Sequence, residues 1–174
     1  GVVTGMLPIP QPLLLVGPGS SARLGQTLCS FRHRKILIVT DRIIAGMGLL
    51  EPLTSALSAG GTRYAVFDAV TADAPIPLIE KGIARFEKEG CDAIVHFAGH
   101  PRELSVAELF ADVLPGAYHM YEGARLHGAK RVVYASSIHA VGFHDVESLP
   151  GTGAAHRPDT FYGLSKTFTE DLAS

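Results

Sequence analysis

The stretch KILIVT, Lys35–Thr40, carries the clearest structural pattern in this chain of 174 residues. Its aliphatic residues follow one another without a polar interruption, which is typical of a strand buried on both faces. A strand with one face in water would alternate apolar and polar residues. The stretch therefore predicts a central strand of a sheet that helices cover on both sides.

Similar apolar runs alternate with helix-like segments along the rest of the chain. We expect further strands at Arg63–Phe67, Asp92–Phe97 and Arg131–Ala135. Helices are expected near residues 20–31, 49–59, 78–88, 104–113, 115–126 and 160–173. The run Leu13–Val16 is expected either to pair at a sheet edge or to extend away from the domain. This order predicts a doubly wound parallel sheet, a three-layer α/β/α domain of the Rossmann-like type spanning residues 1–174.

Composition excludes several classes of protein. With 47% hydrophobic residues, 18% charged residues and a net charge of −2, the chain is expected to be globular, with no nucleic-acid or membrane-surface partner. The opening residues 1–12 lack the charged region of a signal peptide. The two unpatterned cysteines, Cys29 and Cys91, are expected to be reduced thiols, which fits a cytoplasmic protein. The eight histidines follow no zinc spacing, so no metal is expected, and the oligomeric state stays open.

Three residues near the C-terminus suggest a catalytic set. Tyr162 and Lys166 are four residues apart and share one helix face, and Ser137, 25 residues before the tyrosine, follows an apolar strand. They supply a proton donor, a cation that acidifies it and a hydroxyl that holds a carbonyl. Such a set indicates hydride transfer with a nicotinamide cofactor. The alternative is that the three residues are remnants of the fold and bind no cofactor.

The second half of the chain, about residues 91–174, resembles the extended short-chain dehydrogenase/reductases, the NAD-dependent epimerase/dehydratase family, and within it the uronate dehydrogenases. The matching segments are Asp92–Gly99, Tyr121–Arg125, Lys130–Ser137, Arg157–Asp159 and Tyr162–Lys166. The resemblance implies that Tyr162 is the general acid/base, that Lys166 binds the nicotinamide ribose and that Ser137 orients the substrate. It further implies a sugar or sugar-acid substrate, with His139 on the substrate side. The strand end Phe97-Ala98-Gly99 is implied to lie at the cofactor.

The first half, about residues 5–95, resembles the iron-containing (group III) alcohol dehydrogenases. The matching segments are Leu7–Pro10, Gly17–Ser20, Lys35–Asp41, Gly46–Leu49, Val66–Asp68 and Gly90–Val95. Both families carry an Asp-Ala-Ile-Val-like strand, so we interpret the chain as a chimera with its seam near residues 91–99, made by recombination or engineering. The iron-binding helical region of the first family has no counterpart here, and no iron site is expected.

The cofactor loop matches neither family completely. Only Gly46 and Gly48 remain of a glycine-rich turn. Asp41 stands at a position where the pyrophosphate of the cofactor would contact uncharged backbone. Asp68, 20 residues after Gly48, occupies the usual position of a ribose-binding acid. In the iron-containing family, the aspartate matching Asp41 favours NAD over NADP. Each carboxylate is equally well explained as an ordinary strand-end or capping residue.

Three functions therefore stay open. The first is an NAD-dependent oxidoreductase for a sugar or sugar acid, whose turnover is impaired or lost because the cofactor loop and substrate region are incomplete. The second is a recombined or engineered α/β scaffold without catalysis. The third is a nucleotide-binding module without turnover.

Overall fold

A computed structural model of the chain describes residues 13–71, 75–99, 103, 105–148, 150–151 and 153–173. The segment Leu7–Pro10 lies outside these residues. The sheet has four parallel strands in the order β2-β1-β3-β4. Their bounds are Lys35–Val39 for β1, Arg63–Phe67 for β2, Ala93–His96 for β3 and Val132–Tyr134 for β4. The predicted parallel sheet is confirmed, and the KILIVT stretch lies inside it, between β2 and β3.

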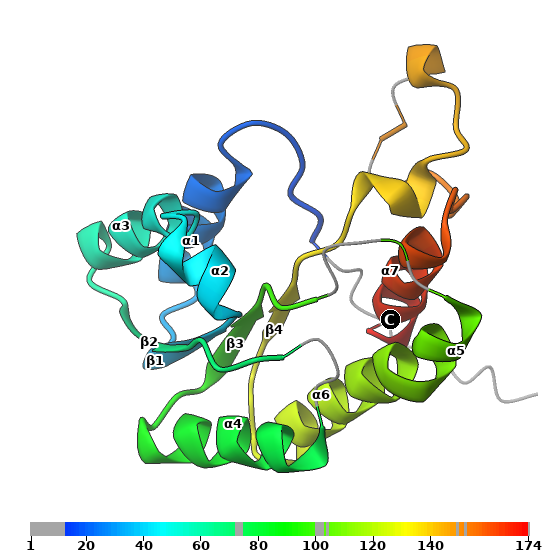
Figure 1. Cartoon of the computed structure of the whole chain (residues 1–174). Helices are drawn as coiled ribbons and strands as arrows, with labels where there is room; N and C mark the ends of the chain where they lie inside the picture. The colour runs from blue at the N-terminus through cyan, green and yellow to red at the C-terminus, as the bar shows by residue number, and fades with distance from the viewer. Residues whose placement is uncertain are drawn as a thin grey trace, which may run out of the picture.

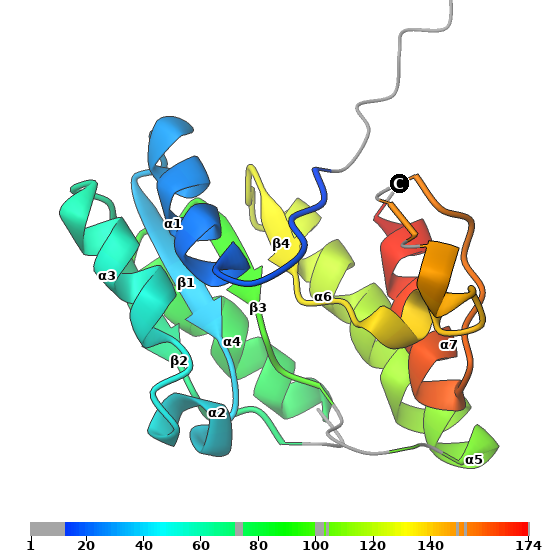
Figure 2. The same ribbon diagram turned by 90° about the horizontal axis from the view of Figure 1, so that it is seen from above.

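Helices cover both faces of this sheet (Figure 1). One face carries α1 (Ser20–Ser30) and α3 (Glu51–Ala59), and the other carries α4 (Ile76–Lys88) and α6 (Leu114–Leu126). The last helix, α7 (Phe161–Leu172), lies against α6 on the side of β4 (Figure 2). The three-layer α/β/α arrangement is therefore as predicted.

The alternation of side chains along β1 explains its unbroken apolar sequence. Ile36 and Ile38 are fully buried in the core under α1 and α3, and Leu37, 2% exposed, belongs to the core under α4 and α6. Successive residues of a strand point to opposite faces, so a strand covered on both sides needs an apolar residue at every position.

Several segments differ from the sequence-based expectation. Leu13–Val16 forms no strand, which excludes pairing at a sheet edge, one of its two expected placements; Leu13 and Val16 are 65% and 61% exposed. A short helix, α2 (Arg42–Gly46), follows β1 where we expected only a remnant of a glycine turn. Residues 106–113 form a short α5 (Val106–Glu108) and a π-helical turn (Leu109–Val113), with Pro115 in the first turn of α6 as predicted.

The long connection from β4 to α7 contains two short 3₁₀ helices, η2 (Ile138–Val141) and η3 (Val146–Ser148). Both cysteines are free thiols, and burial raises the pKa of Cys91 to about 11, so this thiol is unreactive near neutral pH. In the described ranges, every helix is too short or too polar to cross a bilayer.

Candidate active site

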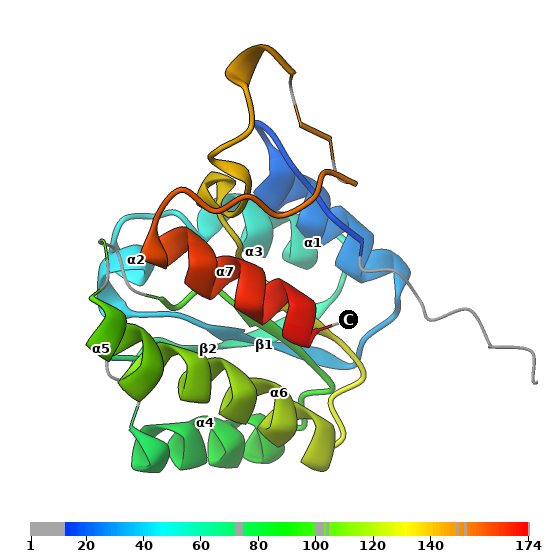
Figure 3. The ribbon, with the colours of Figure 1, turned by 90° about the vertical axis from the view of Figure 1, so that its right-hand side faces the viewer.

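The carboxyl ends of the four parallel strands meet at one rim of the sheet. Asp41 follows β1, Asp68 follows β2, and Phe97-Ala98-Gly99 follow β3. Ser137 follows β4, and α7 passes beside this region (Figure 3). Ligands on sheets of this kind bind at the carboxyl edge. The fold thus places the predicted catalytic and cofactor residues on the edge where a ligand is expected.

Lys166 is a buried lysine beside the end of β4. Only 5% of it is exposed, and its Nζ donates a hydrogen bond of 3.0 Å to the Ala135 carbonyl oxygen. The same Nζ lies 4.7 Å from the ring centre of Tyr134 and 5.3 Å from that of Tyr162. Burial lowers the pKa of Lys166 to about 8, against the opposing charge of Glu170. At pH 7 the amine is therefore still mostly protonated, and its charge faces the Tyr162 ring.

Gly99 brings the end of β3 up to this lysine. A Cβ atom added at Gly99 would lie 3.3 Å from the Lys166 Nζ. The Phe97 amide donates to the Val39 carbonyl at 2.8 Å, which anchors the segment to β1, and Ala98 is buried. The predicted cofactor strand end thus reaches the predicted catalytic lysine.

Tyr162 lies against a hydrogen-bonded His139–Asp159 pair. The His139 and Tyr162 rings meet edge to face, with 5.7 Å between their centres. His139 Nδ1 lies 2.8 Å from Asp159 Oδ1, and this bond lowers the pKa of Asp159. Ser137 Oγ accepts a 3.2 Å bond from the His139 amide, which leaves its hydroxyl hydrogen as a donor. The sequence alone predicts no role for Asp159, although the matching segment Arg157–Asp159 contains it.

Two other tyrosines near this site, Tyr121 and Tyr134, are poor candidates for proton transfer. Burial raises the pKa of Tyr121 to about 12 and raises that of Tyr134 as well. Those two phenols are therefore kept protonated in the neutral pH range. Tyr162 is partly exposed at the rim.

A close approach between α7 and η2 holds Tyr162 and His139 together. Thr160 caps α7 by accepting a 2.9 Å bond from the Gly163 amide. A Cβ atom on Gly163 would lie only 2.2 Å from the His139 carbonyl oxygen. That oxygen belongs to the backbone, so no rotation of a side chain relieves the overlap. A glycine at position 163 is therefore required by the packing.

We expect Gly163→Ala to lower the free energy of unfolding by about 1–3 kcal/mol, the usual cost of overpacking. Urea denaturation followed by circular dichroism measures the change. The control is Gly116→Ala in α6, where an added Cβ meets no atom within 4 Å. Because alanine favours a helix by up to about 1 kcal/mol over glycine, this control should gain stability. Equal effects of the two changes would contradict the assigned close approach.

The remaining predicted residues lie beyond β1 and β2. Asp41 caps α2, and its Oδ1 accepts bonds of 2.9 Å from the Ile43 and Ile44 amides. Gly46 ends α2, Gly48 follows with a positive φ of 72°, and Asp68 is exposed. In the described part of the chain, no hydrogen bond joins these residues to the group around Tyr162. The structure gathers the predicted catalytic residues and leaves the predicted loop residues at a separate part of the rim.

The predicted residues fit the nicotinamide end of a dinucleotide better than they fit its pyrophosphate. Next to Tyr162, Lys166 and Gly99 provide the cation and the open backbone that a nicotinamide ribose needs. At the start of α2, two amides of the kind that bind phosphate already donate to Asp41, whose negative charge opposes a pyrophosphate. For iron the fit fails, because no three His, Cys, Asp or Glu side chains of the described residues lie close enough to hold a metal.

Two family profiles match the chain, each over half of it. Residues 12–99 match the profile of iron-containing alcohol dehydrogenase, and residues 77–174 match that of the NAD dependent epimerase/dehydratase family. Uronate dehydrogenase of Pseudomonas putida is 40% identical over 107 residues, which cover 62% of this chain and 38% of that enzyme. NAD-dependent methanol dehydrogenase of Bacillus methanolicus is 30% identical over 88 residues, 51% of this chain and 23% of that enzyme.

The structural likeness extends further along the chain than the likeness in sequence. A mutant uronate dehydrogenase from Agrobacterium tumefaciens, crystallised in complex with NAD, superposes with a TM-score of 0.59 and 28% identity. The superposition covers 80% of this chain and 54% of that one. The chain thus covers 54% of that structure but only 38% and 23% of the two enzymes named above, less than two thirds of each.

Proposed function

The chain belongs to the iron-containing alcohol dehydrogenase family over residues 12–99 and to the NAD dependent epimerase/dehydratase family over residues 77–174, and from this we propose an NAD-dependent oxidoreductase that acts on a uronic acid. The observation that carries the proposal is the contact group of Tyr162, Lys166 and His139 at the end of β4. We further propose that the chain is a hybrid of the two families. The overlap of their matches at residues 77–99, which contains β3, supports this.

Each residue of this group has a role that follows from its position. The Tyr162 phenol exchanges a proton with the substrate hydroxyl or carbonyl, and the neighbouring Lys166 ammonium favours the phenolate. Ser137 uses its remaining hydroxyl hydrogen to hold the reacting oxygen. When bound, NAD supplies the acceptor for the hydride. The protein's part is to position the substrate and to move the proton.

The acidic substrate is proposed on the side of His139. Because Nδ1 of this imidazole bonds to Asp159, Nε2 is the nitrogen that remains to face a ligand. When both nitrogens carry a hydrogen, Nδ1 donates to Asp159, and the positively charged ring next to Tyr162 offers its Nε2–H to a carboxylate. The likeness to the uronate dehydrogenase of Pseudomonas putida supports a uronate over a neutral sugar.

The charge of Asp41 leads us to propose that NAD binds weakly. We expect Asp41→Asn, which keeps a capping oxygen on α2 and removes the negative charge, to tighten NAD binding about fivefold. Isothermal titration calorimetry of both proteins with NAD and NADP measures the change. If the aspartate instead holds the adenosine ribose, the same variant will bind NAD more weakly and NADP more tightly. That result would contradict the proposed conflict with pyrophosphate.

Titration of the full chain with NAD, followed by an assay of NADH formation from glucuronate and galacturonate, tests the proposed function. NADH formation that requires the uronate supports it. Binding without NADH formation would leave a nucleotide-binding module. No heat of binding and no thermal shift at millimolar NAD would leave a folded scaffold without cofactor chemistry.

A further inference from the structure

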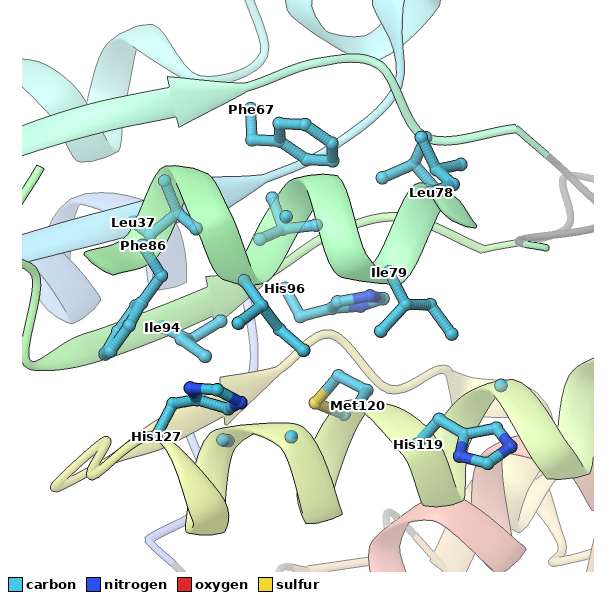
Figure 4. A pocket seen from close by; sticks show the side chains of 17 residues that line it. Leu37, Phe67, Leu78, Ile79, Phe86, Ile94, His96, His119, Met120 and His127 are labelled. Atoms are coloured by element: carbon cyan, nitrogen blue, oxygen red, sulfur yellow. The ribbon is translucent and has the colours of Figure 1, made fainter. Parts of the chain in front are cut away.

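An apolar cavity of about 110 Å³ lies between the sheet and helices α4 and α6 (Figure 4). The strands contribute Leu37, Ile94 and His96 to its wall, and α4 and α6 contribute Phe86 and Met120. The nearby Lys166, Tyr162 and Ser137 are not among its lining residues. The cavity is thus a separate space on the α4/α6 side of the sheet.

Two glycines on the facing helices explain the open volume. Gly82 of α4 and Gly123 of α6 both line the cavity, where a larger residue would fill it. A Cβ atom at Gly82 would lie 3.6 Å from the Phe67 ring, an ordinary contact distance. Alanine would therefore fit at this position, and glycine is not required there by crowding. A helix pays for interior glycine in stability, yet both helices carry one at this wall.

His96 lines this apolar space and carries an unsatisfied polar atom. Ile94 and His96 share the α4/α6 face of β3, because residues two apart in a strand point the same way. The His96 Nδ1 atom is buried and has no hydrogen-bond partner among the described residues. By contrast, the lining residue His127 bonds to Glu87 at 2.7 Å. Buried polar atoms are rarely left without a partner, so Nδ1 calls for a group that the described protein does not provide.

We propose that this cavity binds a small aromatic alcohol of the phenol class, with its ring between α4 and α6 and its hydroxyl on His96 Nδ1. The volume approaches that of an apolar cavity of roughly 150 Å³ that accepts benzene. The Phe67 and Phe86 rings and the Met120 sulfur are surfaces that favour an aromatic ring.

The hydroxyl follows from the chemistry of the histidine. Burial lowers the pKa of His96 to about 4, so the ring is neutral near pH 7. In a neutral imidazole, Nδ1 is a donor in one tautomer and an acceptor in the other. A phenolic hydroxyl both donates and accepts, and it satisfies Nδ1 in either case. Benzene fills the same space and leaves Nδ1 unsatisfied.

Calorimetric titration of the full chain with phenol and with benzene tests this inference. Phenol is expected to bind about three- to tenfold more tightly than benzene, as one neutral hydrogen bond allows. His96→Phe should remove this preference and keep benzene binding, which also shows that the cavity is intact. The proposal would be overturned if His96→Phe kept the preference for phenol over benzene. It would also be overturned if phenol did not bind to the unmodified chain.

A second pair of variants tests the location without touching His96. Gly82→Leu adds a side chain inside the cavity and should abolish binding of both ligands, with retained circular dichroism. The control Ser58→Leu adds the same side chain at an exposed position of α3, across the sheet, and should bind both normally. Phenol binding that survives Gly82→Leu would place the ligand elsewhere and refute the cavity as its site. Because Gly82→Leu and Ser58→Leu leave the residues of the proposed NAD site unchanged, a failure of the uronate assay leaves this test unaffected.

Discussion

Replacing Tyr162 with phenylalanine is expected to reduce uronate oxidation by roughly 10²–10⁴-fold while leaving NAD affinity unchanged. The change removes one hydroxyl and keeps the ring. The ring's contact with His139, 5.7 Å between centres, is therefore retained, and so is its place 5.3 Å from the Lys166 Nζ. What is lost is the proton-transferring group. Steady-state NADH formation, with calorimetric titration of NAD alongside, separates the two effects.

The matched control is Tyr118→Phe in α6. Tyr118 is 50% exposed, and the same hydroxyl is removed away from the contact group of Tyr162, Lys166 and His139. Its turnover is expected to equal that of the unmodified chain. A Tyr162→Phe protein with normal turnover would show that another group transfers the proton. A variant with lost NAD binding would instead mean that the hydroxyl holds the cofactor.

The size of the expected effect depends on Lys166. Burial keeps its pKa near 8, so below that pH its positive charge persists in a region from which water is largely excluded. An electrostatic interaction of this kind weakens less than it would in bulk water. Burial holds Tyr134 and Tyr121 in the neutral form, so neither of these two phenols replaces Tyr162.

The fold was predictable where one physical requirement acts on every residue of a segment. β1 is buried on both faces, so each of its positions is apolar, and the run is visible in the sequence as it stands. β2 matches its predicted bounds, Arg63–Phe67. Tyr162 and Lys166 were predictable as a pair because both lie on one helix at a spacing that the helix itself sets.

Contacts between distant segments were not predictable in the same way. The His139–Asp159 bond joins two positions of an irregular connection. Hydrophobic periodicity predicts helices and strands, but it does not predict the path of such a connection. The short α2 was missed because its start depends on the Asp41 side chain accepting two backbone amides. The unfilled space at Gly82 and Gly123 arises only when α4 and α6 face each other. Local patterns reveal elements, and packing between elements needs the structure.

A parallel sheet is also compatible with the proposed hybrid of the two families. The family matches overlap at residues 77–99, and β3, inside this range, pairs with β1 on one side and β4 on the other. Backbone hydrogen bonds between parallel strands do not depend on the identity of the side chains. Both neighbours need only apolar residues on both faces and a common register. The same exchange is harder at the rim, where each family uses its own polar groups for the cofactor.

Asp92 is expected to be the most sensitive polar residue for stability, with Asp92→Ala lowering the free energy of unfolding by about 3 kcal/mol. Its carboxylate is 3% exposed and accepts bonds of 2.9 and 3.4 Å from the Arg34 and Lys35 amides. Its other oxygen lies 3.1 Å from the Lys130 Nζ. It thereby ties together the starts of β1, β3 and β4. Alanine leaves the two amides without this acceptor, at about 1–3 kcal/mol for each buried group.

Urea denaturation of three variants measures this contribution. Asp92→Asn keeps an oxygen for the two amides and loses only the charge next to Lys130, so a smaller loss of about 1 kcal/mol is expected. Asp68→Ala removes an exposed carboxylate at a strand end and should change stability by less than about 0.5 kcal/mol. If Asp92→Ala proved as mild as Asp68→Ala, the tie between the strands would be refuted.

The dependence of this contribution on pH follows from the pKa of Asp92. Burial alone would raise that pKa, but hydrogen bonds from Lys130 and from the Lys35 and Arg34 amides lower it below its ordinary value. A carboxyl whose pKa is lower in the folded state stabilises the fold above its unfolded pKa of about 3.9. This stabilisation is lost as the pH falls through the folded value. His33, 3.7 Å away and with a pKa lowered by burial, becomes charged only below its ordinary range and then adds to the attraction. The difference in stability between the unmodified chain and Asp92→Asn should therefore be kept from pH 7 to about pH 5, or grow as His33 becomes charged, and should shrink only in stronger acid. A difference that shrank already near pH 6 would contradict this assignment.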